Sequence, residues 1–206
     1  MNRIFNFGAG PAMLPTAVME KAQQEFLNYK NMGASVIEIS HRSPEFDEII
    51  NHCDSTLREL GKIPDNYKIL YVHGGAQMQF SAIPLNLINL KPARKATFVL
   101  TGNWAVKASK EAARYGNCIN IASSEDTNFD RIPEWDTATL DSESSYAYIT
   151  SNNTLYGTRW HNFPDTHEVP LVADMTSEFL SREIDVSQFG IIFAGLQKNL
   201  GPAGLA

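Results

Sequence analysis

Apolar residues recur at the period of an α-helix in two segments of the first third of the chain. The clearer segment spans residues 45 to 60, where Ser43 is placed to cap a helix, Pro44 falls in its first turn and Gly61 ends it. Its apolar face consists of Phe46, Ile49, Ile50, Cys53, Leu57 and Leu60. The second segment, residues 16 to 29, carries Val18, Ala22, Phe26 and Tyr29 on one stripe. We therefore expect two amphipathic helices here.

Further along the chain, short apolar runs of strand length alternate with helical or loop segments. The runs lie near residues 67–73, 95–100, 117–122, 145–150, 169–173 and 190–195. One helical pattern carries Phe80, Ile83 and Leu87 on one face, and another runs from residue 103 to about residue 115. This order predicts an α/β fold with a mainly parallel sheet covered by helices on both faces. The polar segment 126–145 is expected to be a loop with one short helix.

The composition fits one substantial domain. The chain has 206 residues, of which 43% are hydrophobic, and we expect an N-terminal arm over residues 1–15 and a domain over residues 16–206. Its 17 basic and 23 acidic residues give a net charge of −6. The sequence contains no long basic run, so we expect no nucleic-acid partner.

The sequence also argues against a membrane or a secreted location. No stretch approaches the ~20 apolar residues that span a bilayer, and the first residues lack the apolar core of a signal peptide. Cys53 and Cys118 lie far apart and in no metal-ligand spacing, so we expect two buried thiols in a reducing compartment and no metal site. The expected location is the cytoplasm.

Lys198 and Asp174 are the first candidates for chemistry, because each follows an apolar run of strand length. The carboxyl ends of parallel strands meet at one edge of a sheet, so both side chains would open onto one crevice. Pyridoxal phosphate needs such a pair, a lysine for its aldehyde and a carboxylate for its ring nitrogen. The alternatives are that Lys198 is a solvated surface lysine and that Asp174 caps a helix.

Two further segments could serve the same ligand. In His73–Gln77, Gly74 and Gly75 stand between an expected strand and an expected helix, where backbone N–H groups can approach a phosphate. The segment matches neither dinucleotide fingerprint nor P-loop, and the alternative is a tight structural turn. Trp104, at the start of the next helical pattern, could stack on a flat cofactor ring or pack into the core.

In these and other motifs the chain resembles the phosphoserine aminotransferase family, which belongs to the class V, fold-type I enzymes that use pyridoxal phosphate. The motifs extend over nearly the whole sequence in the family's order. They are Phe5–Pro15, Ser40–Ser43, Gly74–Phe80, Gly102–Trp104, Ser151–Thr154, Ala173–Ser177 and Gln197–Gly204.

The resemblance implies a role for each matching residue. Lys198 would form the Schiff base with pyridoxal phosphate and, with Asp174 at the ring nitrogen, carry the catalysis. The other cofactor contacts would come from the backbone N–H groups of Ala76 and Gln77 and from Gln197 at the phosphate, Trp104 on the ring and Thr154 at the ring hydroxyl. His41 and Arg42 would bind the acidic end of the substrate, since the arginine fork suits a phosphate or a carboxylate.

The resemblance also implies an activity: amino transfer between L-glutamate and 3-phosphohydroxypyruvate, giving O-phospho-L-serine and 2-oxoglutarate. This would serve serine biosynthesis and, in many bacteria, pyridoxine biosynthesis, with small-molecule substrates and a homodimeric full-length protein. The rivals are another class V enzyme, such as an alanine–glyoxylate aminotransferase or a cysteine desulfurase. A third reading is a cofactor-binding or self-associating domain without turnover.

Two departures from the family pattern bear on these expectations. Many relatives carry a small hydroxyl residue where Gln77 stands, so only its backbone contribution carries over. The sequence ends eight residues after Lys198, whereas family members continue for a roughly equal further length that holds the small domain and a carboxylate-binding arginine. We therefore expect an N-terminal fragment, truncated before the small domain, with little or no transamination by itself.

Overall fold

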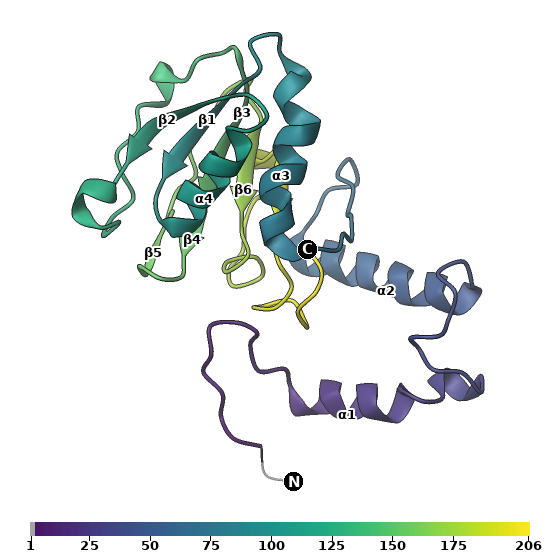
Figure 1. Ribbon diagram of the computed structural model, residues 1–206. Coiled ribbons are helices and arrows are strands. Elements are labelled where there is room, and N and C mark those ends of the chain that lie inside the picture. The colour runs from purple at the N-terminus through teal and green to yellow at the C-terminus, as the bar shows by residue number, and fades with distance from the viewer. Residues whose placement is uncertain (1–2) are drawn as a thin grey trace. The chain divides into compact units, whose positions relative to one another are not determined.

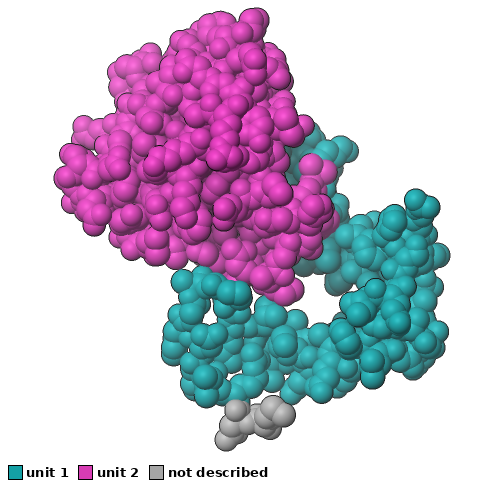
Figure 2. Space-filling view, viewed as in Figure 1, with its two compact units in different colours: residues 1–69 teal, residues 70–206 magenta. Residues whose placement is uncertain are grey.

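The computed structural model describes residues 3–206, which form two compact units divided after Ile69 (Figure 2). Residues 1 and 2 of the expected N-terminal arm lie outside the described residues. The rest of that arm belongs to the first unit, and a domain beginning at residue 16 stays a prediction.

The first unit contains the two expected helices. α2 spans Pro44–Gly61, and Ser43 caps it, because its Oγ accepts a hydrogen bond of 3.3 Å from the backbone N–H of Phe46. The expected apolar face of α2 holds no buried residue, and the expectation that Cys53 is buried is wrong, because its thiol is exposed. Helical periodicity shows which face of a helix is apolar, but it does not show whether another element covers that face.

The other helix, α1, spans Thr16–Glu25 and ends four residues earlier than expected. Asn28 is extended, and its side chain accepts a hydrogen bond of 2.7 Å from the backbone N–H of Gly33. This turn and the following 3₁₀ helix η1 (Tyr29–Asn31) replace the last helical turn. Most of the expected stripe is exposed, since Val18 and Phe26 are about half exposed while Tyr29 alone is buried.

The second unit contains a five-stranded parallel sheet in the order β2-β1-β3-β6-β7 (Figure 1). The strands are β1 (Lys95–Leu100), β2 (Asn117–Ser123), β3 (Ser144–Thr150), β6 (Leu171–Asp174) and β7 (Ile191–Phe193). A two-stranded antiparallel hairpin, β4 (Asn152–Asn153) and β5 (Thr158–Arg159), follows β3. The five strands correspond to five of the six apolar runs, and the predicted parallel α/β fold is confirmed.

The sixth run, residues 67–73, is wrong as a strand of the sheet. Leu70 is 73% exposed, and the only strand-like pairing in this run within residues 3–206 is a bridge between His73 and Leu205. Val72 and Ala206 exchange two backbone hydrogen bonds of 2.9 Å beside it. The run is apolar enough for a buried strand, but the backbone N–H and C=O groups of Val72 bond Ala206 and not a strand of the sheet.

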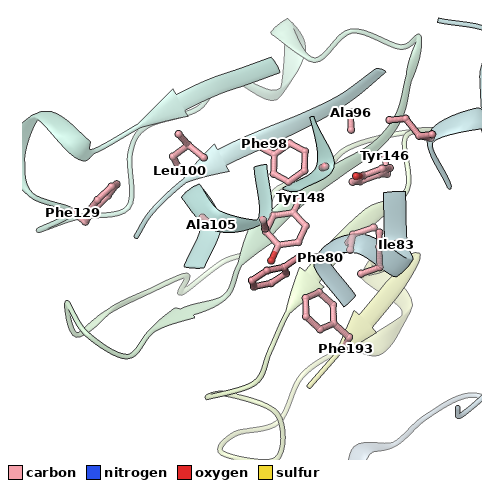
Figure 3. Packing of buried hydrophobic residues seen from close by; sticks show 14 residues of the cluster. Phe80, Ile83, Ala96, Phe98, Leu100, Ala105, Phe129, Tyr146, Tyr148 and Phe193 are labelled. Carbon is pink, nitrogen blue, oxygen red and sulfur yellow. The ribbon is translucent and has the colours of Figure 1, made fainter. Parts of the chain in front are cut away.

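Two α-helices and the 3₁₀ helix η2 (Ile88–Leu90) cover one face of the sheet (Figure 1). α3 spans Gly75–Leu87 and buries Phe80 and Ile83, as its pattern predicted, while α4 spans Asn103–Ala112. Between the helices and the sheet lies an aromatic core, in which the ring of Phe98 stacks on that of Tyr148 at a centroid distance of 4.9 Å (Figure 3).

Within the second unit, connections without α-helices cover the other face of the sheet, so the expectation of helices on both faces is not met there. The core on this face holds Ile149 and Leu171 of the sheet together with Trp160 and Phe189 from the connections. Segment 126–145, expected to contain one short helix, contributes to this layer, and it overlaps two 3₁₀ turns, η3 (Glu125–Thr127) and η4 (Thr137–Thr139). A third, η5 (Val186–Gln188), precedes β7. No helix within residues 3–206 combines the length and apolarity that crossing a membrane requires.

We expect Phe98→Ala to lower the free energy of unfolding by about 3–5 kcal/mol, because the ring is fully buried and its removal leaves a cavity between two tyrosines. Urea titration followed by circular dichroism measures the change. The matched control is Leu155→Ala, whose side chain is 65% exposed and whose loss should cost within about 0.5 kcal/mol. Equal effects of the two substitutions would contradict the placement of Phe98 at the centre of this core.

Candidate active site

The candidate site lies at the edge of the sheet where the parallel strands end. Thr150 of β3 is in register with Asp174 of β6, and Asp174 is in register with Phe193 of β7. The segments that leave these strands carry the polar residues of the motifs, including Thr154 and Lys198. Asp174, the last residue of β6, and Lys198, beyond β7, therefore lie at the carboxyl ends of parallel strands, as predicted.

Asp174 is a buried carboxylate held by one neighbour along the chain. Its Oδ1 accepts hydrogen bonds from the backbone N–H and the Oγ1 of Thr176, at 3.0 and 2.6 Å. Burial raises the pKa of Asp174, while the two bonds from Thr176 and the charge of Lys198 oppose that rise. The alternative role as a helix cap is wrong, because the residues after Asp174 form turns and no helix.

Lys198 lies in a turn beyond β7, with its side chain half-buried. Its Nζ donates a hydrogen bond of 2.6 Å to Oγ1 of Thr154. Burial lowers the pKa of Lys198, and the negative charge of Asp174 counteracts part of that effect. The amine is therefore more readily deprotonated than a solvated lysine, and the reading of Lys198 as an ordinary surface charge does not fit this environment.

The N-terminus of α3 lies beside the segment that leads to Lys198. A Cβ added at Gly195 would lie 3.2 Å from Cβ of Ala76, in the first turn of α3, and 2.5 Å from Oε1 of Gln197. At the helix N-cap, Gly74 has a φ of 91°, a conformation that favours glycine. Ala76 and Gln197 thus meet at Gly195, while the side chain of Gln77 is exposed.

Trp104 lies in the first turn of α4, half-buried against the aromatic core. Its indole is 6.5 Å from the ring of Phe80, centroid to centroid, and Nζ of Lys107 lies 4.6 Å from its ring centroid. It packs on the edge of the core, as one of the two roles weighed for it requires, and its stacking on a cofactor ring stays a prediction.

Two residues that the sequence reasoning did not single out connect these segments. Asn153 is buried and accepts a hydrogen bond of 3.1 Å from Oγ1 of Thr101, which joins the loop before Trp104 to the loop that carries Thr154. Oγ1 of Thr176 bonds Asp174 and also accepts a bond of 3.2 Å from the backbone N–H of Gly195. The Asp-x-Thr spacing was a usable signal for Thr176, because such pairs form local turns. The position of Asn153 depends on long-range packing and had no local signal.

His41 and Arg42 lie in the first unit, in the turn before α2, and both side chains are exposed. The backbone N–H of Arg42 donates a hydrogen bond of 3.2 Å to Oγ of Ser40. Their expected role at the substrate stays a prediction. Within residues 3–206, no group of three or more His, Cys, Asp or Glu side chains could hold a metal ion.

The chemistry of the second unit is thus that of a desolvated amine, a buried carboxylate and a helix N-terminus at one end of a parallel sheet. The amine can add to a carbonyl group when it is deprotonated. The carboxylate can hold a protonated ring nitrogen, and the first-turn N–H groups of α3 can bind a phosphate.

Comparison with known proteins gives a consistent assignment. The family model described as "Aminotransferase class-V" matches residues 4–206. A phosphoserine aminotransferase from Bacillus cereus is 52% identical over 100% of this chain and 56% of its own length. The fold matches a solved phosphoserine aminotransferase, studied for radiation damage of its Schiff base, with a TM-score of 0.94 and 45% identity over 99% of this chain and 57% of that one.

A more distant solved structure is that of a phosphoserine aminotransferase from Trichomonas vaginalis, described as bound to PLP. It is 38% identical with a TM-score of 0.89, over 98% of this chain and 56% of that one. The chain therefore spans little more than half the length of the relatives it matches.

The raised pKa of Asp174 predicts a specific dependence of stability on pH. Between the pKa of the unfolded chain and the higher pKa of the folded state, the folded state binds more protons, so the free energy of unfolding falls as pH rises. Asp174→Asn does not titrate and keeps an oxygen that can accept from Thr176. We expect the variant to lose this fall and to gain stability relative to the parent protein with rising pH.

Urea unfolding at a series of pH values, on protein freed of any cofactor, measures this effect. Asp165→Asn is the control, since it makes the same change of a carboxyl to an amide at a side chain that is 80% exposed. Parallel profiles for Asp174→Asn and the parent protein would show that burial does not raise this pKa.

Proposed function

The chain belongs to the class-V aminotransferase family. We propose that it functions as a phosphoserine aminotransferase, which moves an amino group between L-glutamate and 3-phosphohydroxypyruvate. The products would be O-phospho-L-serine and 2-oxoglutarate. The names of relatives about 50% identical to the chain support this activity. Because the chain spans 56% of those relatives, their activity is carried over as a proposal.

The single observation that carries the proposal is the environment of Lys198. Its amine is half-buried, has a lowered pKa and donates to Thr154 at 2.6 Å, while Asp174 lies near enough to interact with it electrostatically. A lysine that served only solubility would gain nothing from desolvation, which disfavours its charge. A lysine that must act as a nucleophile and a base needs this property.

The residues at this end of the sheet fit pyridoxal phosphate. When bound, this cofactor supplies an aldehyde that bonds an amine and a ring that draws electrons from the reacting carbon of the substrate. Lys198 would provide the amine, and Asp174 would hold the ring nitrogen. The remaining contacts would come from the backbone N–H groups of Ala76 and Gln77, and from Gln197, Trp104 and Thr154.

Asp174 suits its proposed place because one oxygen is already engaged. Thr176 donates twice to Oδ1, which fixes the carboxylate plane and leaves Oδ2 for a further donor. A protonated ring nitrogen would be such a donor. It would also compensate the buried negative charge, so cofactor binding and ionisation of Asp174 would favour one another.

Lys198 would also move a proton at the substrate. Once released from the cofactor, the amine of Lys198 would take the proton from the substrate Cα and deliver it to C4′ of the cofactor. A lowered pKa suits this task, because a base works best when its pKa lies near the working pH. Thr154 would orient the amine between these transfers.

His41 and Arg42 would bind the distal anion of the substrate, which is a phosphate in phosphoserine and a carboxylate in glutamate. The planar guanidinium can bond either group through two donors. His41 and Arg42 favour an acidic substrate, which distinguishes the proposed activity from that of class V enzymes that act on alanine. A cysteine desulfurase reading gains no support from Cys118, because burial raises the pKa of its thiol to about 11.

We expect the purified protein to take up pyridoxal phosphate and to show visible absorption that borohydride removes. Peptide mapping after reduction should place the pyridoxyl mass on Lys198, the desolvated amine. Lys107, which lies over Trp104, and Lys110 are the comparison sites on α4. A label on either of these lysines in place of Lys198 would refute the assignment.

In a protein of the relatives' full length, we expect Arg42→Lys to lower kcat/KM for phosphoserine about tenfold or more, because lysine cannot form the two parallel bonds to an anion. The same substitution should change kcat/KM for alanine much less. Arg114→Lys is the control, since the Arg114 side chain is 74% exposed in the other unit. Equal losses with phosphoserine and alanine would assign Arg42 a structural role.

A further inference from the structure

Three hydroxyl groups on one face of β3 are buried without hydrogen-bond partners among residues 3–206. They belong to Tyr146, Tyr148 and Thr150, which alternate along the strand and so point to the same side of the sheet. Figure 3 shows Tyr146 and Tyr148 in the aromatic core, with the Tyr148 hydroxyl toward Phe80. Buried hydroxyls are rarely unpaired in folded proteins, so these three need an explanation.

Two of the three hydroxyls belong to residues next to Asp174. Thr150 is the register partner of Asp174 on the neighbouring strand, and Tyr148 is the partner of Val172, two residues earlier. The ring of Tyr148 also packs 6.3 Å, centroid to centroid, from that of Phe193, the register partner of Asp174 on the other side. The side chains of Tyr148, Thr150 and Asp174 therefore lie on the same face of neighbouring strands.

The electrostatics agree with this placement. Burial raises the pKa of Tyr148 well above its usual value, the charge of Asp174 raises it further, and the hydroxyl of Thr150 opposes the rise. Tyr148 and Thr150 alternate along β3 and so lie on the same face, although their hydroxyls do not reach hydrogen-bond geometry. Burial also raises the pKa of Tyr146. The second cause of that rise is the charge of the Cys118 thiolate, whereas for Tyr148 it is the charge of Asp174. Tyr146 is therefore buried like Tyr148, but it lacks the influence of Asp174.

The hydroxyls of Tyr148 and Thr150 complement the carboxylate of Asp174 chemically. An ionised carboxylate only accepts hydrogen bonds, whereas a hydroxyl can donate one and accept others. Thr176 donates twice to Oδ1 of Asp174, and a carboxylate has about four lone-pair sites, so it can accept from a water in addition to a ring nitrogen. A buried water needs two to four polar partners, a number that the Tyr148 and Thr150 hydroxyls and the Asp174 carboxylate provide together.

We propose that Tyr148 and Thr150 are positioning residues for Asp174, whose hydroxyls donate to its carboxylate through one shared buried water and favour its ionised form. Both residues lie in β3, and Tyr148 belongs to the aromatic core. The effect on the carboxylate is independent of turnover. Its value for catalysis rests on the proposed function, in which the ionised carboxylate holds a ring nitrogen.

The test follows the ionisation of Asp174 itself in protein freed of cofactor. Aspartate labelled with ¹³C at the side-chain carboxyl gives a resonance that shifts on protonation, and Asp174→Asn identifies the signal by its loss. Tyr148→Phe and Thr150→Val each remove one hydroxyl and keep the shape of the side chain. We expect both to move the titration midpoint of Asp174 upward, because each removes support for the charged form.

Tyr146→Phe is the matched control, since it removes a hydroxyl that is equally buried and unpaired on the same strand face. It should leave the midpoint of Asp174 unchanged. Lys198 is the charged group that faces Asp174 from beyond β7, so the comparison is repeated in Lys198→Met, where Tyr148→Phe should produce the same upward shift.

Unchanged midpoints in both Tyr148→Phe and Thr150→Val would overturn the proposal. So would equal shifts in Tyr148→Phe and Tyr146→Phe, which would indicate a general effect of core hydroxyls. If Tyr148→Phe fails to fold, Thr150→Val decides alone. Because no substrate or cofactor enters the measurement, its failure is distinct from a failure of the borohydride labelling.

Discussion

The parallel pairing of β3, β6 and β7 is the constraint on which the rest of the second unit depends. It aligns Thr150, Asp174 and Phe193 side by side, so every segment that leaves the sheet starts from one edge. The turns that follow need little length to bring Thr154, Asp174 and Lys198 into mutual range. The aromatic core beneath them fixes this alignment, because Tyr148 packs on Phe193 and Phe193 packs on Phe80 of α3.

The polar groups at this edge are arranged at a cost to stability. A buried carboxylate and a half-buried amine are each held in surroundings that disfavour their charges. Their mutual attraction offsets part of that cost, and the bonds from Thr176 offset more. Selection for stability alone would have replaced such a pair by apolar side chains, so the arrangement indicates a functional demand.

The sequence predicted features that depend on local pattern and failed where distant partners decide. Five strands and the cap at Ser43 were predictable because apolar runs and turn residues carry their own signal. Residues 67–73 have the same signal, yet the hydrogen bonds of Val72 go to a loop more than a hundred residues away. The burial of Cys53 failed similarly, since periodicity identifies a face without its covering. Lys198 and Asp174 were found because each follows an apolar run in the sequence, whereas Asn153 acts through long-range packing.

The hydrogen bonds between Val72 and Ala206 also bear on the order in which the second unit assembles. They join residues near the two ends of this unit, and the segment between them contains the whole sheet. Within the same segment, the backbone N–H of Leu196 donates to the carbonyl oxygen of Leu205. Loop-closure entropy makes contacts between distant residues slow to form. We infer that the turn around Lys198 gains its final surroundings only after the strands have paired. The amine would therefore stay solvated, and ordinary in its reactivity, until folding of the unit is nearly complete.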